Sequence, residues 1–133
     1  MSTIEIWTDG SSVENGTPFA KAGWACCFNM GGKWFVRYGN VKKINDTYPT
    51  NNRGEIAGVL YGLLVLQEFK GVSANIFSDS QYVINSMTKW RYGWERDGKY
   101  FKNQDMFLPL FKAWDNSLGR HTIQWVKGHS GVK

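Results

Sequence analysis

The sequence predicts one α/β domain over residues 1–133, built on a five-stranded mixed sheet. Three observations lead to this fold class. Five short apolar segments have the composition of strands, three longer segments repeat apolar residues at helical spacing, and glycines separate several of them. The predicted order is three strands, a helix, a strand, two helices and a final strand, which is typical of a mixed sheet with helices packed against it.

The first part of the chain contains three predicted strands. Residues 4–8 are apolar in alternation and are followed by Asp9-Gly10, a pair that predicts a turn. Residues 24–28 form the second strand, and Gly31-Gly32 makes a tight turn into the third, over about 33–42. We therefore expect the second and third strands to form a hairpin.

The rest of the chain changes period. Residues 91–102 are polar, basic and aromatic, and they have no clean period. The other segments are assigned by helical spacing or by short apolar runs: helices over 53–68, 80–90 and 104–118, and strands over 74–77 and 122–126. Gly71 and Gly119 follow two of these helices, as expected of C-terminal stop signals.

Charge and composition narrow the class of protein. The net charge of +5 and pI of about 9.3 suit a polyanionic partner. No apolar run approaches the roughly 20 residues of a membrane span, and the N-terminus enters a strand pattern at once, so we expect neither a membrane protein nor a secretory signal. Cys26 and Cys27 are adjacent in a strand, where their side chains point to opposite faces. A disulfide between them is therefore not expected, and we predict a cytoplasmic protein.

Three acidic residues stand out, although each has a simple structural explanation. Asp9 fits a turn, Glu55 fits a capping box with Asn52, and Asp79 fits a helix N-terminus. Their positions together argue for function. If the strands before Asp9 and Asp79 are parallel neighbours, both residues leave the carboxyl edge of the sheet, where ligands of α/β proteins bind.

Carboxylates gathered at one edge would repel one another and take up protons unless a cation lies among them. Hard divalent cations such as Mg2+ prefer carboxylate oxygens. In a basic chain, this arrangement points to metal-assisted phosphoryl chemistry on a polyanion.

Five sequence motifs, spread over nearly the whole chain, carry a family resemblance. They are Thr8-Asp9-Gly10-Ser11, Thr50-Asn51-Asn52-Arg53 leading to Glu55, Ser78-Asp79-Ser80-Gln81-Tyr82-Val83, Lys102-Asn103-Gln104-Asp105, and Trp125-Val126-Lys127-Gly128-His129-Ser130-Gly131. In order and spacing the chain resembles a type 1 ribonuclease H, which cuts the RNA strand of an RNA–DNA hybrid. The resemblance implies a ribonuclease H-like sheet with helices on both faces, the last helix being absent from this sequence.

The resemblance also implies the roles of the site residues. Asp9, Glu55 and Asp79 would be metal ligands and catalytic residues for two Mg2+ ions, with Mn2+ as an alternative, and His129 would assist proton transfer or product release. Products would carry a 5′ phosphate and a 3′ hydroxyl. Outside the resemblance, a histidine between glycine and serine in a loop needs no such role.

The resemblance implies further residues that bind the RNA–DNA hybrid. Asn15, Asn51, Asn52 and Gln81 would contact the minor groove and the sugar hydroxyls, Trp90 and Trp94 would line a channel for the DNA strand, and Thr50 and Asn103 would hold a DNA phosphate. By themselves, Asn15 fits a turn, Asn51 and Asn52 fit a helix-entry loop, and both tryptophans fit a core. We expect a monomer that binds no membrane.

One departure from the family leaves alternatives open. The family has a fourth carboxylate in a final helix, whereas this sequence stops at Lys133. Asp105 and Asp115 lie in an earlier predicted helix and are poor replacements by position. We expect reduced activity at this length. The chain is then an active endoribonuclease, a hybrid-binding module with weak or no cleavage, or a domain from a reverse transcriptase polyprotein or another nuclease of this fold.

Overall fold

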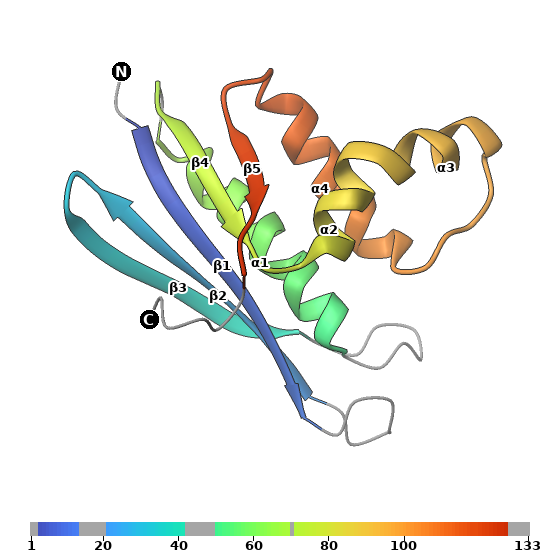
Figure 1. The fold of residues 1–133 in the computed structure, drawn as a ribbon, viewed down its shortest axis with the longest axis horizontal. Helices are drawn as coiled ribbons and strands as arrows, with labels where there is room; N and C mark the ends of the chain where they lie inside the picture. The colour runs from blue at the N-terminus through green and yellow to red at the C-terminus, as the bar shows by residue number, and fades with distance from the viewer. Residues whose placement is uncertain (1–2, 14–20, 42–49, 70, 128–133) are drawn as a thin grey trace.

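The computed structural model describes residues 3–13, 21–41, 50–69 and 71–127. It contains a five-stranded sheet in the order β3-β2-β1-β4-β5, in which β1, β2 and β3 are antiparallel neighbours and β4 and β5 run parallel to β1 (Figure 1). The predicted mixed sheet is confirmed. The elements are β1 Thr3–Val13, β2 Lys21–Met30, β3 Lys33–Val41, α1 Asn51–Leu66, β4 Ser73–Ser78, α2 Gln81–Asn85, the π-helix η1 Ser86–Trp90, α3 Arg91–Asp97, α4 Gln104–Asn116 and β5 Thr122–Trp125.

The first strand is longer than the sequence predicts. It continues through Asp9 and Gly10, and Asp9 lies opposite Ala25 of β2. The predicted turn at Asp9-Gly10 is therefore wrong. Gly10 is needed for another reason: a Cβ atom there would lie 2.4 Å from the backbone nitrogen of Glu55, so only glycine lets α1 approach the strand this closely.

Helix α1 begins earlier than predicted, at Asn51. Its N-cap is Thr50, whose Oγ1 accepts a hydrogen bond from the backbone N–H of Arg53 at 3.2 Å. The proposed capping box of Asn52 and Glu55 is therefore wrong, because both residues already lie inside the helix. Because the helix starts here, the Glu55 side chain points to the sheet edge and does not cap the helix.

The second predicted helix extends beyond residue 90. It begins after the N-cap Ser80, whose Oγ accepts a hydrogen bond from the Val83 N–H at 3.2 Å, and it passes from α2 through η1 into α3. Helix α3 was missed, since its aromatic and basic residues follow no apolar period. A π-turn shifts the register of the residues that follow it, which also hides the continuity from a periodicity argument.

The helices form one layer on the sheet. Helix α1 lies on β1 and β2, α4 packs on α1, and α2 and α3 continue this layer beside α4 (Figure 1). Ile4 and Ile6 face the helices and are buried, whereas Trp7 faces the other side, where it stacks on Phe77 with ring centroids 4.4 Å apart. Helices were expected on both faces of the sheet. Within the described residues, all the helices lie on one face.

The structure also bears on the two cysteines and on membrane-spanning helices. Cys26 is buried, its Sγ donates to the carbonyl of Gly58 at 2.9 Å, and Cys27 is also a free thiol, so the expected absence of a mutual disulfide is confirmed. Across the described residues no helix combines the length and apolar character needed to cross a bilayer.

Candidate metal centre

Three carboxylates that are far apart in the sequence converge at one edge of the sheet. Asp9 lies in β1, Glu55 in the second turn of α1, and Asp79 directly after β4. Because β1 and β4 are parallel and Thr8 pairs with Ser78, the residues that follow the pair emerge side by side. One carboxylate oxygen from each acidic residue lies within 4.8 Å of the other two, which is close enough to share a metal ion.

Small residues bring the start of α1 against the strands. In addition to Gly10, Gly54 allows a close approach, because a Cβ there would lie 2.7 Å from the carbonyl oxygen of Gly23 in β2. Gly58, one turn further along, would place a Cβ 3.3 Å from that of Thr8. Any larger residue at position 10 or 54 would push α1 outward, and Glu55 would move with it.

Glu55 is a buried acid with a raised pKa. Its side chain is only 8% exposed, Oε1 accepts a hydrogen bond from the Gly10 N–H at 3.0 Å, and Oε2 is buried without a hydrogen-bond donor among the described residues. Burial is the largest cause that raises the pKa of Glu55 from 4.5 to about 8, and repulsion and a hydrogen bond from Asp79, with repulsion from Asp9, contribute to the same rise. Near neutral pH the metal-free site therefore holds a proton on Glu55 that a cation would displace.

The donor set fits a hard divalent cation. All three groups offer carboxylate oxygens, with no thiolate or imidazole in this group of the described residues. Oxygen-only sites suit Mg2+, Ca2+ and Mn2+ rather than zinc or copper. The orphaned Oε2 of Glu55 is an oxygen placed to coordinate such an ion.

The predicted hybrid-binding residues of α1 and α2 lie close to the carboxylates along the chain. Asn51 and Asn52 are exposed in the first turn of α1, and Gln81 is exposed at the start of α2, two residues after Asp79. Thr50 uses its hydroxyl oxygen as the N-cap of α1, which leaves the hydroxyl proton available to an outside acceptor. Exposed amides beside the acidic cluster are available to a ligand that donates and accepts hydrogen bonds.

The two predicted tryptophans have different environments. Trp90 is 45% exposed, whereas Trp94 packs against the core and stacks on Phe101 with ring centroids 4.4 Å apart. The ring centroids of Trp90 and Trp94 are 6.3 Å apart, so they share a face as predicted. Trp94 thus also has the structural role that the sequence left open for both.

Asn103 is buried within a polar network. It is 4% exposed, has a positive φ of 62°, and its Oδ1 accepts a hydrogen bond from Arg53 Nη1 at 3.1 Å. Its Nδ2 donates to Tyr82 Oη at 3.0 Å. Arg53, which is fully buried, also forms a two-pronged ion pair with Asp105. The role of Arg53 was not predicted, because in the sequence it stands only as part of a motif; the signal would have been an arginine between the apolar positions of a buried helix.

The other candidate carboxylates belong to ion pairs. Asp105 binds Arg53, and Asp115 binds Arg91 with Oδ2 2.8 Å from Nη2. Neither belongs to the acidic group at the sheet edge, as expected from their sequence positions. Asn15 and His129 lie outside the described residues.

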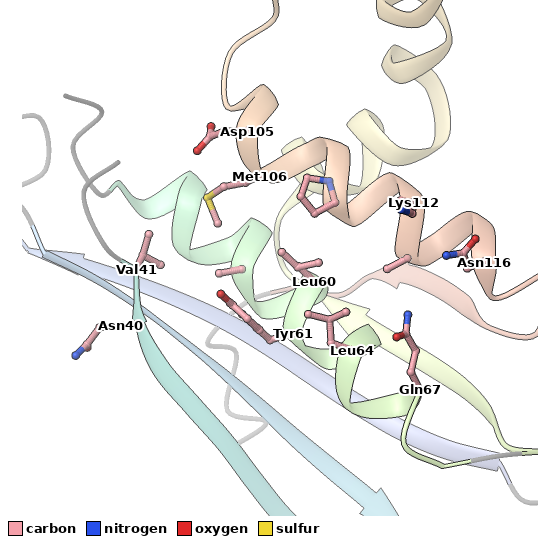
Figure 2. A pocket seen from close by; sticks show the side chains of 13 residues that line it. Asn40, Val41, Leu60, Tyr61, Leu64, Gln67, Asp105, Met106, Lys112 and Asn116 are labelled. Atoms are coloured by element: carbon pink, nitrogen blue, oxygen red, sulfur yellow. The ribbon is translucent and has the colours of Figure 1, made fainter. Parts of the chain in front are cut away.

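A groove of about 710 Å³ lies on another part of the molecule, between α1, α4 and the end of β3 (Figure 2). Leu60, Tyr61 and Met106 are among the side chains that line it, and none of the three clustered carboxylates does. The acidic cluster therefore lies at the sheet edge and not inside this groove.

The whole chain matches a known protein family. The family model described as RNase H matches residues 1–133. This chain belongs to the RNase H family. It is 38% identical to the ribonuclease H of Oleidesulfovibrio alaskensis over 98% of this chain and 82% of that protein, and 38% identical to the ribonuclease HI of Haemophilus ducreyi over the same shares.

Solved structures share the RNase H fold. One is a crystal structure of LC11-RNase H1 in complex with an RNA/DNA hybrid, with a TM-score of 0.63 and 17% identity over 92% of this chain and 84% of that one. At this identity the match supports the fold alone. The family assignment rests on the family model and on the closer relatives.

Proposed function

We propose that this protein hydrolyses the RNA strand of RNA–DNA hybrids with the help of divalent metal ions. The observation that carries the proposal is the convergence of Asp9, Glu55 and Asp79 within 4.8 Å in a chain of the RNase H family. Similar proteins are named ribonuclease H, and a structural neighbour was solved with an RNA/DNA hybrid. The net charge of +5 favours a polyanionic substrate.

The three carboxylates would hold the metal, and we propose Mg2+ as the ion, with two ions per site and Mn2+ as a substitute. Bound metal would polarise the scissile phosphate and lower the pKa of a bound water. Glu55 would lose its proton when the ion binds, and the Gly10 N–H would hold its Oε1 in place. The products would carry a 5′ phosphate and a 3′ hydroxyl.

Recognition of the hybrid would divide between two groups of residues. The exposed amides of Asn51, Asn52 and Gln81 suit the RNA strand, because an amide both donates to and accepts from a 2′ hydroxyl. The exposed Trp90, with Lys89 beside it in the sequence, suits the DNA backbone through packing and charge. We assign Thr50, Trp94 and Asn103 to the same strand. The assignments of Asn15 and His129 remain predictions.

The alternative is a hybrid-binding module with weak or no cleavage. It follows if three carboxylates are too few to hold the metal ions that the reaction needs. A single RNase H domain over residues 1–133, a monomeric state and a cytoplasmic location also remain proposals.

The test is cleavage of an end-labelled RNA–DNA hybrid in Mg2+, with duplex RNA and duplex DNA as comparisons. We expect cuts only in the RNA of the hybrid, with 5′-phosphorylated products, and no cuts by the Asp9→Asn variant. Tight binding without cleavage would favour the binding module. Equal cleavage of duplex RNA would overturn the proposed substrate.

A further inference from the structure

The bend between β4 and α2 carries Asp79, and Trp125 at the end of β5 donates a hydrogen bond to the backbone of this bend. We infer that Trp125 is a positioning residue for the proposed metal centre: its indole N–H fixes the backbone of Asp79 and thereby the direction of the Asp79 carboxylate. The inference rests on the proposed function, because it takes Asp79 as a metal ligand.

Asp79 has less support from secondary structure than the other two clustered acids. Asp9 lies within the paired part of β1, and Glu55 lies within α1. Asp79 lies between Ser78, the last residue of β4, and Ser80, the N-cap of α2. A strand or a helix holds its own backbone through regular hydrogen bonds, whereas the backbone of a bend needs other partners.

Both peptide units that flank Asp79 are bound by β5 and the residue after it. The carbonyl oxygen of Ser78 accepts a hydrogen bond from the Val126 backbone N–H at 2.9 Å. The carbonyl oxygen of Asp79 accepts one from Trp125 Nε1 at 3.0 Å. The second peptide unit is also held at its nitrogen, because the Ser80 N–H donates to Ser78 Oγ at 3.1 Å. With both units fixed, the direction of the Cα–Cβ bond of Asp79 is fixed too.

The contact from Trp125 can be removed with little disturbance to the fold. The Val126 bond belongs to the backbone and continues the parallel pairing of β4 with β5, and Ser78 is fully buried. Trp125, in contrast, is 46% exposed. Asp79 precedes the N-cap of α2, so its carbonyl lies outside the helical ladder. The indole N–H therefore acts on the bend and not on a helix.

The size of the effect follows from the strength of one hydrogen bond. Residues that orient a metal ligand typically contribute about ten- to a hundredfold to metal affinity. Trp125 contributes one neutral bond at a site that water reaches, so we expect the lower end, about tenfold. Without the indole N–H the ion still draws Asp79 into place when enough metal is present.

The first test is calorimetric titration of Trp125→Phe with Mn2+ at pH 8, without nucleic acid. We expect the dissociation constant to rise about tenfold over that of the wild type. Trp7→Phe is the matched control: Trp7 lies two residues before Asp9, and its indole nitrogen is buried without an acceptor among the described residues. Its dissociation constant should stay within about twofold of the wild type. Equal Mn2+ affinity of Trp125→Phe and the wild type overturns the inference.

The second test separates the hydrogen bond from packing of the ring. A benzothienylalanine introduced only at position 125 keeps a bicyclic ring and carries sulfur in place of the indole N–H. We expect this protein to bind Mn2+ as weakly as Trp125→Phe does, within about twofold. It also gives the answer if Trp125→Phe does not fold. Wild-type affinity in the analogue protein would assign the effect to packing, and the inference would be wrong.

Cleavage kinetics distinguish a positioning residue from one that binds nucleic acid. In Trp125→Phe the Mg2+ concentration for half-maximal cleavage should rise about tenfold, whereas KM for the hybrid and kcat at saturating Mg2+ should stay within about twofold. A raised KM with an unchanged Mg2+ dependence would mean that the exposed ring binds the hybrid, which contradicts the inference.

Failure of the proposed function has a different signature. A wild type that binds Mn2+ without cutting the hybrid would defeat the proposed reaction, and the Mn2+ titrations would still decide the role of Trp125. A wild type that binds neither Mn2+ nor Mg2+ would overturn both the metal centre and this inference.

Discussion

Glu55 lies in the second turn of α1 and Asp105 in the first turn of α4, and the pKa values of the two carboxylates shift in opposite directions. The Arg53 guanidinium beside Asp105 lowers the pKa of that carboxyl. Burial and the nearby Asp79 raise the pKa of Glu55 to about 8. Arg53 and Glu55 are only two residues apart. The start of one helix therefore contributes both to the ion pair of Arg53 with Asp105, the compensated pair, and to an acid with a raised pKa, Glu55, the strained acid. The comparison separates an arrangement that supports the fold from one that prepares a cation site.

The largest effect is expected on the cleavage rate, when one of the clustered carboxylates is replaced by an amide. Glu55→Gln or Asp79→Asn should lower the rate of hybrid cleavage by about a thousandfold or more, because an amide is a poor ligand for a divalent ion. The folded state should persist, as checked by circular dichroism. Asp115→Asn is the control, and its cleavage rate should stay close to that of the wild type. A Glu55→Gln enzyme of full activity would contradict the assignment.

The next largest effect concerns the glycines that bring the strained acid into place. Gly10→Ala should lower the free energy of unfolding by about 3 kcal/mol, because the new Cβ meets the Glu55 backbone nitrogen at 2.4 Å. Gly62→Ala, further along α1, is the matched control: its Cβ meets Cys26 Sγ at an ordinary 3.4 Å. That variant should change stability by less than about 1 kcal/mol, in either direction. Urea denaturation measures both, and equal losses would refute the close-approach argument.

Breaking the ion pair of Arg53 with Asp105 should lower the free energy of unfolding somewhat less than Gly10→Ala does. Asp105→Asn leaves the fully buried Arg53 charge without its carboxylate, and we expect a loss of about 2 kcal/mol in unfolding free energy. Asp115→Asn should cost less than about 1 kcal/mol, since Asp115 is 58% exposed and Arg91 keeps its bond to Glu95. Thermal melts of both variants would check the ranking, and the reverse order would contradict it.

The smallest effect is a pH dependence of the metal-free protein. Between about pH 4.5 and 8 the folded state holds a proton on Glu55 that the unfolded state has released, so rising pH favours unfolding. In chelator, the free energy of unfolding of the wild type should fall relative to that of Glu55→Gln across this window. Taking the difference cancels His121, whose pKa is lowered by burial and by Arg120. A difference in unfolding free energy that does not change with pH would mean that the pKa of Glu55 is not raised in the folded state.

The sequence predicted the five strands and the convergence of the three acidic residues at one edge of the sheet correctly, because alternating apolar residues and strand-end motifs are local signals. It misread Asp9-Gly10 as a turn, since a glycine needed for the approach of a distant helix has the same local appearance as a turn glycine. It placed the cap of α1 at Asn52 in place of Thr50 because both residues are good N-caps.

Other features depend on contacts that only the folded chain defines. The burial of Arg53 depends on Asp105 and Asn103, which lie some fifty residues away in the sequence. The helical state of 91–97 depends on packing of Trp94 on Phe101, since the segment lacks an apolar period of its own. Long-range pairs of this kind leave no regular spacing for a sequence argument to detect.

The most direct test of the central claim is divalent-ion binding by calorimetric titration at pH 8, without nucleic acid. The wild type and Asp105→Asn should both bind Mg2+ or Mn2+ with heat and with release of protons, since the ion displaces the proton of Glu55. Glu55→Gln should show neither. Equal binding by Glu55→Gln and the wild type would contradict the claim that Asp9, Glu55 and Asp79 form the metal centre.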